Sequence, residues 1–149
     1  MCRKTHTIIN IASILILLIA AVFVAVFKIT FISEQSMAPT LREGQATLVC
    51  KCYHNYESGD IITFNTDEYG VCIKRIIAQP GDTIELKDGV IYKNEIRLSP
   101  YTCSKDISVT YVLDTGQYFV IGDNYNASID SRNYGPISQN DIIGKVILY

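Results

Sequence analysis

The sequence predicts a mainly β domain, folded as a compact all-β barrel or sandwich, that follows one N-terminal transmembrane helix. Three observations lead to this fold class. The first is a run of twenty almost wholly apolar residues, 8–27, near the start of the chain. The second is a series of short strand-like runs, each bounded by turn residues. The third is that no second helical pattern of any length separates these runs, as it would in an α/β protein.

The apolar run over residues 8–27 is interrupted only by Asn10 and Ser13. At about 1.5 Å rise per residue, a helix of this length spans roughly 30 Å, the thickness of one hydrocarbon core. A cleavable secretory signal is the alternative, but its apolar core is only about 7–15 residues long and a small-residue A-x-A site follows it. No such site follows here. The sequence therefore predicts a retained transmembrane helix over residues 8–30.

The distribution of charge predicts how this helix is oriented. Arg3 and Lys4 lie in a short tail, residues 1–7, and cationic flanks stay on the cytoplasmic side. Lys28, at the other end, weakens this bias without cancelling it, because its side chain can reach outward to the interface. We therefore expect a single-pass cell-membrane protein with a cytoplasmic N-terminus and an extracytoplasmic β-rich domain over residues 31–149.

Eight runs of strand-forming residues follow the apolar run. Asp88-Gly89, between two of them, is a hairpin signal. Residues 53–59 and 99–106 are expected to be loops. The longest polar segment, residues 122–140, is expected to be a functional loop, because long loops in compact domains often carry function. The expected strands are Gln45–Cys50, Asp60–Asn65, Val71–Ala78, Thr83–Lys87, Val90–Lys93, Ser108–Leu113, Gln117–Ile121 and Ile142–Leu148.

The composition argues against several classes of partner. The net charge is −2, and there is no basic patch with interleaved aromatic residues, so no nucleic-acid partner is expected. Neither the spacing of Cys50 and Cys52 nor the two histidines, His6 and His54, complete a metal motif. We therefore expect neither a metal nor a cofactor.

Four cysteines fall in the expected extracytoplasmic domain, where disulfides are permitted. Four thiols allow three pairings, and the sequence does not choose among them. Free thiols buried on strands are an equally good interpretation. The residues concerned are Cys50, Cys52, Cys72 and Cys103.

Lys74 is a candidate general base. A lysine acts as a base only when neutral, and apolar surroundings favour the neutral amine. In a strand, Cys72, Lys74 and Ile76 share one mostly apolar face. An ordinary exposed lysine on an edge strand is the alternative. A Ser-His-Asp site would have to use His54, which has no neighbouring motif to support it.

Ser36 is a candidate nucleophile. It begins the segment Ser36-Met37-Ala38-Pro39, just past the apolar run. Pro39 fixes its own φ and pushes Ala38 toward an extended conformation, so the turn is stiff. Taken alone, it could also be an ordinary linker turn.

Together these segments resemble the type I signal peptidases, bacterial serine proteases with a Ser-Lys dyad. The match covers essentially the whole chain, and its three motifs occur in the family's order after one N-terminal span. The resemblance implies a small catalytic core of the signal peptidase fold. The matching segments are Ser36-Met37-x-Pro39-Thr40-Leu41 for the nucleophile, Lys74-Arg75-x-x-x-x-Pro80-Gly81-Asp82 for the base, and Gly122-Asp123-Asn124 with Ser128-x-Asp130-Ser131-Arg132 and Gly135 for the third motif.

The resemblance implies a role for each matched residue. Ser36 would attack the peptide carbonyl, and its backbone amide would donate to the oxyanion. Lys74 would take the serine proton and later activate water. Ser128 would hydrogen-bond the Lys74 amine, while Asp130 and Arg132 would pair and hold the loop.

The resemblance also implies the substrate, which is a secretory precursor cut after small residues at positions −1 and −3 (A-x-A). Shallow apolar pockets explain that choice, because a larger side chain would clash. The precursor would lie extended beside residues 32–36 and 70–74. The enzyme is expected to be a monomer in contact with membrane lipid. The expected pocket walls are Ile32, Met37, Leu41, Cys72 and Ile73.

One departure from the family concerns Glu34, which stands where many members have Ser or Gly. A serine there can supply a second oxyanion donor and a carboxylate cannot, so that donor stays open. We expect Glu34 to point away from the oxyanion.

Three other kinds of protein share part of this pattern. A non-catalytic relative that assists pilus assembly would lack the dyad. A self-cleaving Ser-Lys repressor would carry a DNA-binding domain in place of the span. The eukaryotic-type signal peptidases use His in the position of Lys74.

Overall fold

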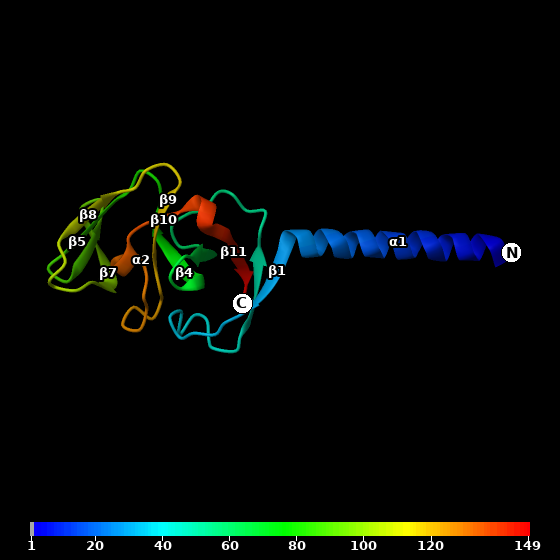
Figure 1. Cartoon of the computed structure of the whole chain (residues 1–149), viewed down its shortest axis with the longest axis horizontal. Coiled ribbons are helices and arrows are strands. Elements are labelled where there is room, and N and C mark those ends of the chain that lie inside the picture. The colour runs from blue at the N-terminus through cyan, green and yellow to red at the C-terminus, as the bar shows by residue number, and fades with distance from the viewer. Residues whose placement is uncertain (1) are drawn as a thin grey trace.

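The computed structural model describes residues 2–149, in which one long helix leads into two β-sheets (Figure 1). Met1, the first residue of the expected cytoplasmic tail, lies outside the described residues. Figure 1 shows the helix α1 (Cys2–Val26) projecting away from the sheets, with its N-terminal end farthest from them. The mainly β fold predicted from the sequence is thus confirmed for the part of the chain that follows α1.

Helix α1 is formed by the apolar run, which contains no glycine or proline to break it. Its side chains from Asn10 to Ala25 are all exposed. Among the residues that the structure describes, no helix combines the length and the apolarity that crossing a membrane requires.

The junction between helix and sheet differs from the sequence prediction of a helix over residues 8–30. Helix α1 ends at Val26, and Phe27–Phe31 form strand β1, which pairs antiparallel with β2 (Ala46–Cys50). Lys51, directly after β2, donates its backbone N–H to the Val26 carbonyl at 2.8 Å. Pairing with β2 therefore decides the conformation here, because aromatic and β-branched residues suit a strand as well as they suit an apolar helix.

The first sheet has seven antiparallel strands in the order β1-β2-β11-β3-β4-β9-β10. Its outer strands, β1 and β10, do not pair with each other within the described residues, so the sheet is open. The barrel alternative is therefore wrong, because β10 is too short to close the sheet and β1 leads directly out of α1. The remaining strands are β3 (Ile61–Thr66), β4 (Gly70–Ala78), β9 (Gln117–Ile121), β10 (Ile137–Ser138) and β11 (Ile142–Leu148).

The second sheet has four antiparallel strands in the order β7-β6-β5-β8. Asp88 and Gly89 have positive φ angles of 52° and 80°, which fit the hairpin turn expected between β5 and β6. Strand β7 includes residues 99–102, expected to be loop. Pro100 is tolerated there because β7 is an edge strand, where a missing N–H costs little. The strands are β5 (Thr83–Lys87), β6 (Val90–Lys93), β7 (Ile96–Thr102) and β8 (Val109–Val112).

The polar segment 122–140 is only partly a loop. It contains the short helix α2 (Ser131–Tyr134) and strand β10, and the 3-10 turn η1 (Gln139–Asp141) begins at its end. These short elements return the chain to the edge of the first sheet, beside β9.

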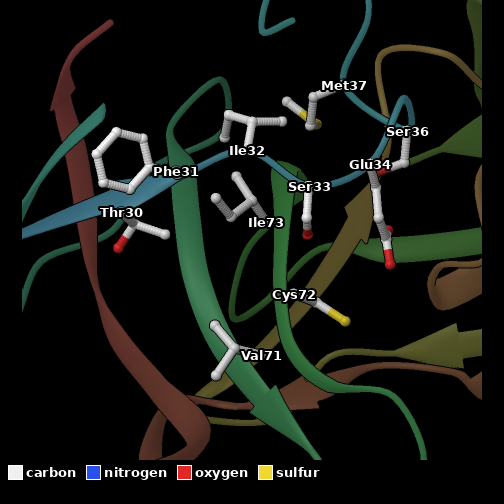
Figure 2. Close-up of a pocket in the computed structure, with 10 residues that line it drawn as sticks. All are labelled: Thr30, Phe31, Ile32, Ser33, Glu34, Ser36, Met37, Val71, Cys72 and Ile73. Atoms are coloured by element: carbon white, nitrogen blue, oxygen red, sulfur yellow. The ribbon is translucent and has the colours of Figure 1, made fainter. Parts of the chain in front are cut away.

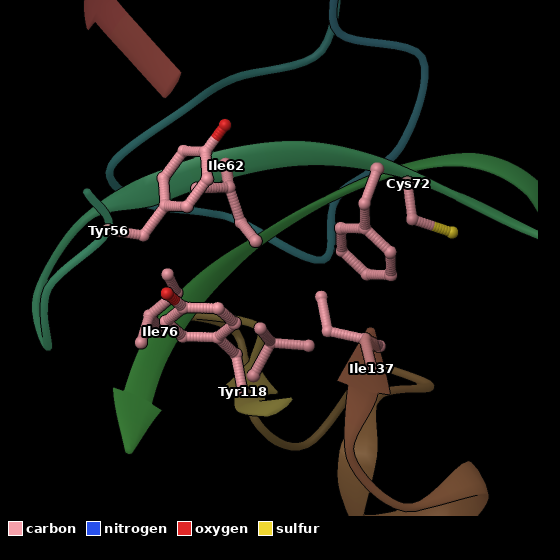
Figure 3. Packing of buried hydrophobic residues seen from close by; sticks show 8 residues of the cluster. Tyr56, Ile62, Cys72, Ile76, Tyr118 and Ile137 are labelled. Carbon is pink, nitrogen blue, oxygen red and sulfur yellow. The ribbon is translucent and has the colours of Figure 1, made fainter. Parts of the chain in front are cut away.

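Three clusters of buried apolar residues stabilise the two sheets. Figure 3 shows the cluster that includes Cys72 and Ile76 of β4 and Tyr118 of β9. Lys74 lies between Cys72 and Ile76 in the strand, so it belongs to this buried face, as alternation predicts. A second cluster supports the turn after β1 and contains Ile32, Met37, Leu41, Val49, Ile61 and Val146.

Candidate active site

The structure brings Ser36 and Lys74 into direct contact. A hydrogen bond of 2.8 Å joins Lys74 Nζ and Ser36 Oγ. Both residues are buried, with Ser36 7% and Lys74 2% exposed. Ser36 lies in the turn after β1, and Lys74 lies in the middle of β4. Two residues that the sequence singles out separately therefore belong to one site.

Lys74 is almost fully buried, although the exposed Glu34 and Glu43 line the same hollow. No carboxylate among the described residues forms an ion pair with it. Among the described residues, the Lys74 amine forms its side-chain hydrogen bond with Ser36. Burying an ammonium without a counter-ion is costly. Lys74 is therefore held beside the Ser36 hydroxyl without a counter-ion in direct contact.

The turn that carries Ser36 is held on two sides. Met37 and Leu41 are 1% and 0% exposed and pack in the apolar cluster that supports the turn. Asn124 donates its backbone N–H to the Ser36 carbonyl (2.9 Å) and its Nδ2 to the Gln35 carbonyl (3.1 Å). No acceptor within the described residues takes the Ser36 N–H. That N–H is therefore available to a ligand.

The loop after β9 is held by the expected pair of Asp130 and Arg132, which the structure forms. Arg132 Nε and Nη2 donate to the two carboxylate oxygens of Asp130, each at 2.8 Å. Asp130 also accepts from the Gly122 N–H (3.0 Å), and its side chain caps α2. Arg132 donates further to the carbonyls of Ser128 (3.2 Å) and Thr102 (2.9 Å). The network thus joins the loop to β9 and to β7 of the second sheet.

Ser128 lies in this loop, against Gly122 and the Ser36 carbonyl. A Cβ at Gly122 would overlap both Ser128 Oγ and the Ser36 carbonyl oxygen, so only glycine permits this close approach. The Ser128 hydroxyl is buried and makes no hydrogen bond within the described residues. The hydrogen bond expected between Lys74 and Ser128 is therefore not formed in this structure, because the loop packs Ser128 against Gly122.

A further ion pair, which was not expected from the sequence, joins β4 to the start of the same loop. Arg75 Nη2 lies 2.6 Å from Asp123 Oδ2, and Arg75 Nε lies 2.8 Å from Asp123 Oδ1. Burial raises the pKa of Asp123, but hydrogen bonds from Arg75 and Thr40, together with the Arg75 charge, outweigh it and hold the pKa below its usual value. The signal was present in the sequence, since both partners stand inside the matching motifs.

A cavity of about 150 Å³ opens beside Ser36, between the segment 30–37 and strand β4 (Figure 2). Four of the five expected wall residues line it. The fifth, Leu41, does not, because it is fully buried and packs with Met37 in the cluster below. The lining consists of Thr30, Phe31, Ile32, Ser33, Glu34, Ser36, Met37, Val71, Cys72 and Ile73.

A second hollow continues the cleft past Ser36 and is lined by Lys74. Its outer rim is formed by Tyr69, from the hairpin between β3 and β4, and by Ala127 and Ile129, from the loop after β9. Sequence reasoning missed these rim residues, because no local pattern distinguishes them from ordinary loop positions. Glu34 is exposed and borders both hollows.

One side of the cleft is a free strand edge. Strand β3 pairs with residues 70–75 of β4, whereas β9 pairs only with Arg75, Ile76 and Ala78. Within the described chain, the outer edge of residues 70–74 therefore has no strand partner. Its backbone groups are open to an added strand.

A serine hydroxyl that meets a buried amine, in a cleft with room for an extended chain, is typical of peptidases that act through an acyl-enzyme. Comparison with known proteins agrees with this class. A family model described as signal peptidase, peptidase S26, matches residues 5–149. The chain belongs to this family, and it is a hydrolase of the serine endopeptidase type.

Relatives from bacteria illustrate the match. Signal peptidase I V of Bacillus subtilis (strain 168) is 34% identical over 142 residues, which cover 82% of this chain and 84% of the relative. Signal peptidase I U of the same organism is 35% identical over 162 residues, with coverage of 95% and 86%. A solved structure of a signal peptidase I from Enterococcus faecalis V583 is 30% identical, covers 62% of this chain and 97% of its own, and has a TM-score of 0.49.

Proposed function

We propose that this chain removes N-terminal signal peptides from secretory precursor proteins, with Ser36 as the nucleophile and Lys74 as the general base. The observation that carries the proposal is the 2.8 Å contact between Lys74 Nζ and Ser36 Oγ, with both residues buried. The substrate class is supported by the names of the relatives, both of which are signal peptidases.

In the acylation step, Lys74 accepts the hydroxyl proton of Ser36 while Oγ attacks the carbonyl carbon before the cleaved bond. The oxyanion that forms would accept from the Ser36 N–H, which no other acceptor takes within the described residues. Collapse of the intermediate breaks the C–N bond, and the Lys74 ammonium gives its proton to the leaving amine. The mature protein departs, and the signal peptide stays as an ester on Ser36.

Hydrolysis of the ester uses the same two residues. Lys74, neutral again, takes a proton from water while the water oxygen attacks the ester carbonyl. When this second intermediate collapses, the proton passes from Lys74 to Ser36 Oγ. The signal peptide then leaves with a new carboxyl terminus, and the enzyme is restored without any cofactor.

The preference for small residues at positions −1 and −3 would follow from the cavity. In an extended peptide, alternate side chains point the same way, so both positions face one wall. That wall is formed by Ile32, Met37, Cys72 and Ile73. Both side chains would have to share a cavity of about 150 Å³, so bulky groups at the two positions would clash. The free edge of residues 70–74 would hold the peptide backbone.

Ser128 would stabilise Lys74 in its charged form, by accepting a hydrogen bond from the ammonium group. An ammonium group has three donors, and the contact with Ser36 accounts for one. The buried Ser128 hydroxyl lacks a partner within the described residues, and leaving such a group unsatisfied costs about 1–3 kcal/mol. A small rotation that lets it accept from the ammonium would stabilise the intermediate. Asp130 and Arg132 would keep the loop in place for that contact.

The apolar run over residues 8–27 would anchor the chain in the cell membrane, with residues 1–7 in the cytoplasm and residues 31–149 outside it. Support comes from the side chains of α1, which present a large unpartnered apolar surface, and such surfaces mark interaction sites. Basic residues in the tail favour this orientation. An anchored monomer would keep Ser36 near the membrane lipid where precursors emerge, which raises the effective concentration. The most exposed members are Ile11, Ile14, Leu15, Ile16, Leu17, Leu18, Ile19, Val22 and Val24.

The proposal is tested by cleavage of a precursor peptide with an Ala-x-Ala site, using the full chain in detergent micelles and mass spectrometry to locate the cut. Ser36→Ala and Lys74→Met should each abolish cleavage. Methionine keeps the length and apolar packing of the lysine stem, so the fold should persist by circular dichroism. Lys87→Ala, which removes an exposed lysine of β5, is the control and should cleave at the wild-type rate.

Retained cleavage by Lys74→Met would overturn the role of the amine. If the folded wild-type chain does not cleave the peptide, the alternative function is favoured, which is a non-catalytic accessory role in pilus assembly. That role does not require the Ser36–Lys74 contact.

A further inference from the structure

Two thiols outside the active site lie in contact. Cys50 Sγ and Cys52 Sγ are 3.2 Å apart and share a hydrogen bond. Cys50 is buried at the end of β2, whereas Cys52 is exposed in the turn that follows. Both thiols are free. A disulfide needs a sulfur–sulfur distance of about 2.05 Å, so the two atoms would have to approach by only about 1.1 Å.

The two cysteines differ in how firmly they are held. Cys50 pairs with Phe27 of β1 and with Lys145 of β11, so strands lie on both sides of it. A Cβ at Gly144 would overlap the Cys50 carbonyl, which shows how closely β11 packs there. Cys52 lies outside the sheet and reaches solvent. The exposed thiol is therefore the one that can meet a reagent and move, and the buried thiol is the fixed partner.

The residue between them ties the sheet to α1. Lys51 donates its backbone N–H to the Val26 carbonyl (2.8 Å) and its Nζ to the Val24 carbonyl (2.9 Å). These carbonyls lie at the C-terminal end of α1, where a helix has no partners of its own for them. A bond between Cys50 and Cys52 would enclose the Lys51 backbone in a small ring.

We propose that Cys50 and Cys52 form a redox-active dithiol that closes to a disulfide by exchange with an organic disulfide, and that closure loosens the hold of Lys51 on α1. The Cys52 side chain can rotate toward Cys50, and the small ring so formed restricts and bends the backbone at Lys51, because Cys50 stays fixed in the sheet. Bending there lengthens the hydrogen bonds to Val26 and Val24.

Oxidation of the two thiols requires one co-reactant, an organic disulfide. Cys52, as the thiolate, attacks one sulfur of the organic disulfide, forms a mixed disulfide and releases one thiol. Cys50 then loses its proton and attacks Cys52 Sγ, which closes the internal bond and releases the second thiol. The two cysteines give up two electrons and two protons, and the organic disulfide becomes two thiols.

Cys72 and Cys103 provide matched controls, because neither contacts a second thiol among the side chains that the structure describes. Cys103 is half-buried, and its Sγ donates to the Val90 carbonyl (3.4 Å). Cys72 lies at the active site, with Thr66 Oγ1 4.0 Å from its Sγ. The hydrogen bond with Cys50 raises the pKa of the Cys52 thiol. Exchange should therefore be slow at neutral pH, so the reaction needs an excess of oxidant.

The test treats the reduced full chain in detergent micelles with an excess of oxidised glutathione. Peptide mapping by mass spectrometry should find one peptide with a Cys50–Cys52 bond, lighter by two hydrogens. Cys50→Ser should instead keep a glutathione adduct on Cys52, because no thiol is left to displace it. Cys103→Ser should close the bond as the wild type does. A wild-type chain that stays reduced, or that keeps glutathione on Cys52 without closing, would overturn the dithiol.

Hydrogen exchange tests the link to the helix. The Lys51 amide should exchange about tenfold faster in the oxidised chain, the change expected when one backbone hydrogen bond is lost. Equal protection in both states would overturn the loosening of α1. Cleavage of the Ala-x-Ala peptide is measured separately on the reduced chain, so failure of this inference and failure of the proposed function give different results.

Discussion

Lys74 and Arg75 are neighbours in β4, yet they lie on opposite faces of the strand in opposite surroundings. Lys74 is 2% exposed, contacts Ser36 and has no ion pair within the described residues. Arg75 pairs with Asp123 at 2.6 Å and its side chain is 24% exposed. Strand alternation alone separates them. The difference teaches that one strand can place a buried amine without a counter-ion directly beside a guanidinium that is paired with a carboxylate.

The largest effect is expected when the difference between Lys74 and Arg75 is removed by substitution. Lys74→Arg should lower kcat by at least about 10³-fold, because a guanidinium stays protonated and cannot act as a base. The mirror change, Arg75→Lys, keeps the charge and should leave kcat within about tenfold while losing the two-point contact with Asp123. Both are measured by peptide cleavage. Substantial activity in Lys74→Arg would show that the comparison is mistaken.

The second prediction removes the partner of Arg75. Asp123→Asn should lower the free energy of unfolding by about 1–3 kcal/mol at pH 7, because a charged and partly buried hydrogen-bond partner is lost. Denaturation in urea measures this change. The effect on kcat should be smaller than that of Lys74→Arg, since Asp123 does not contact the reacting atoms.

The lowered pKa of Asp123 sets the pH dependence of that difference. A carboxylate whose pKa is lower in the folded chain contributes stability above its unfolded pKa of about 3.9, and this is lost as the pH falls through the folded value. The gap between the wild type and Asp123→Asn should therefore be full at pH 7 and shrink below about pH 4. A gap that widens on acidification would contradict this assignment.

The third prediction concerns Ser128, whose hydroxyl has no hydrogen-bond partner within the described residues. Ser128→Ala should lower kcat by about tenfold, if the hydroxyl accepts from the charged Lys74 during the reaction. Stability should stay the same or rise slightly, because an unsatisfied buried hydroxyl is removed. Ser108→Ala, at an exposed position, is the control. If the free energy of unfolding falls by as much as the free energy of activation rises, Ser128 has a structural role only.

The smallest effect is expected at Glu34, on the rim of the cleft. Glu34→Ser should raise kcat by about threefold to tenfold, because the serine can donate a hydrogen bond to the oxyanion. This gain is smaller than the change in kcat of about 10²-fold or more that a well-placed oxyanion donor produces. Glu34→Ala removes the charge without adding a donor, so it separates the two causes. If both variants gain equally, the charge of Glu34 alone is responsible; if neither gains, Glu34 does not act on the oxyanion.

Most strands could be predicted from the sequence, because their alternation and turn residues are local signals. Strand β1 could not, because Phe27–Phe31 continue an apolar run and only the partner strand β2 makes them extended. Residues 99–102 of β7 were expected to be loop, and Pro100 is acceptable in this strand only because β7 lies at the edge of its sheet. In both cases the deciding fact is a neighbour distant in the sequence.

The site was predictable as a set of residues, but only in part as a geometry. Alternation predicted that Lys74 shares a buried face with Cys72, and the family motifs named Ser36. Spacing could not show that Leu41 belongs to the layer under the cavity and not to its wall. It also could not show which way the Ser128 hydroxyl turns, since that depends on the packing of the loop against Gly122.

Strand β1 follows α1 without an intervening loop. At about 3.3 Å per residue, the five residues of β1 extend about 16 Å from the end of the helix, and one short turn then reaches Ser36. For an anchored chain, the height of the serine above the bilayer is therefore fixed by the protein itself. A precursor would be cut only if its cleavage point emerges at that height, so the length of its signal peptide would be selected as well as its sequence.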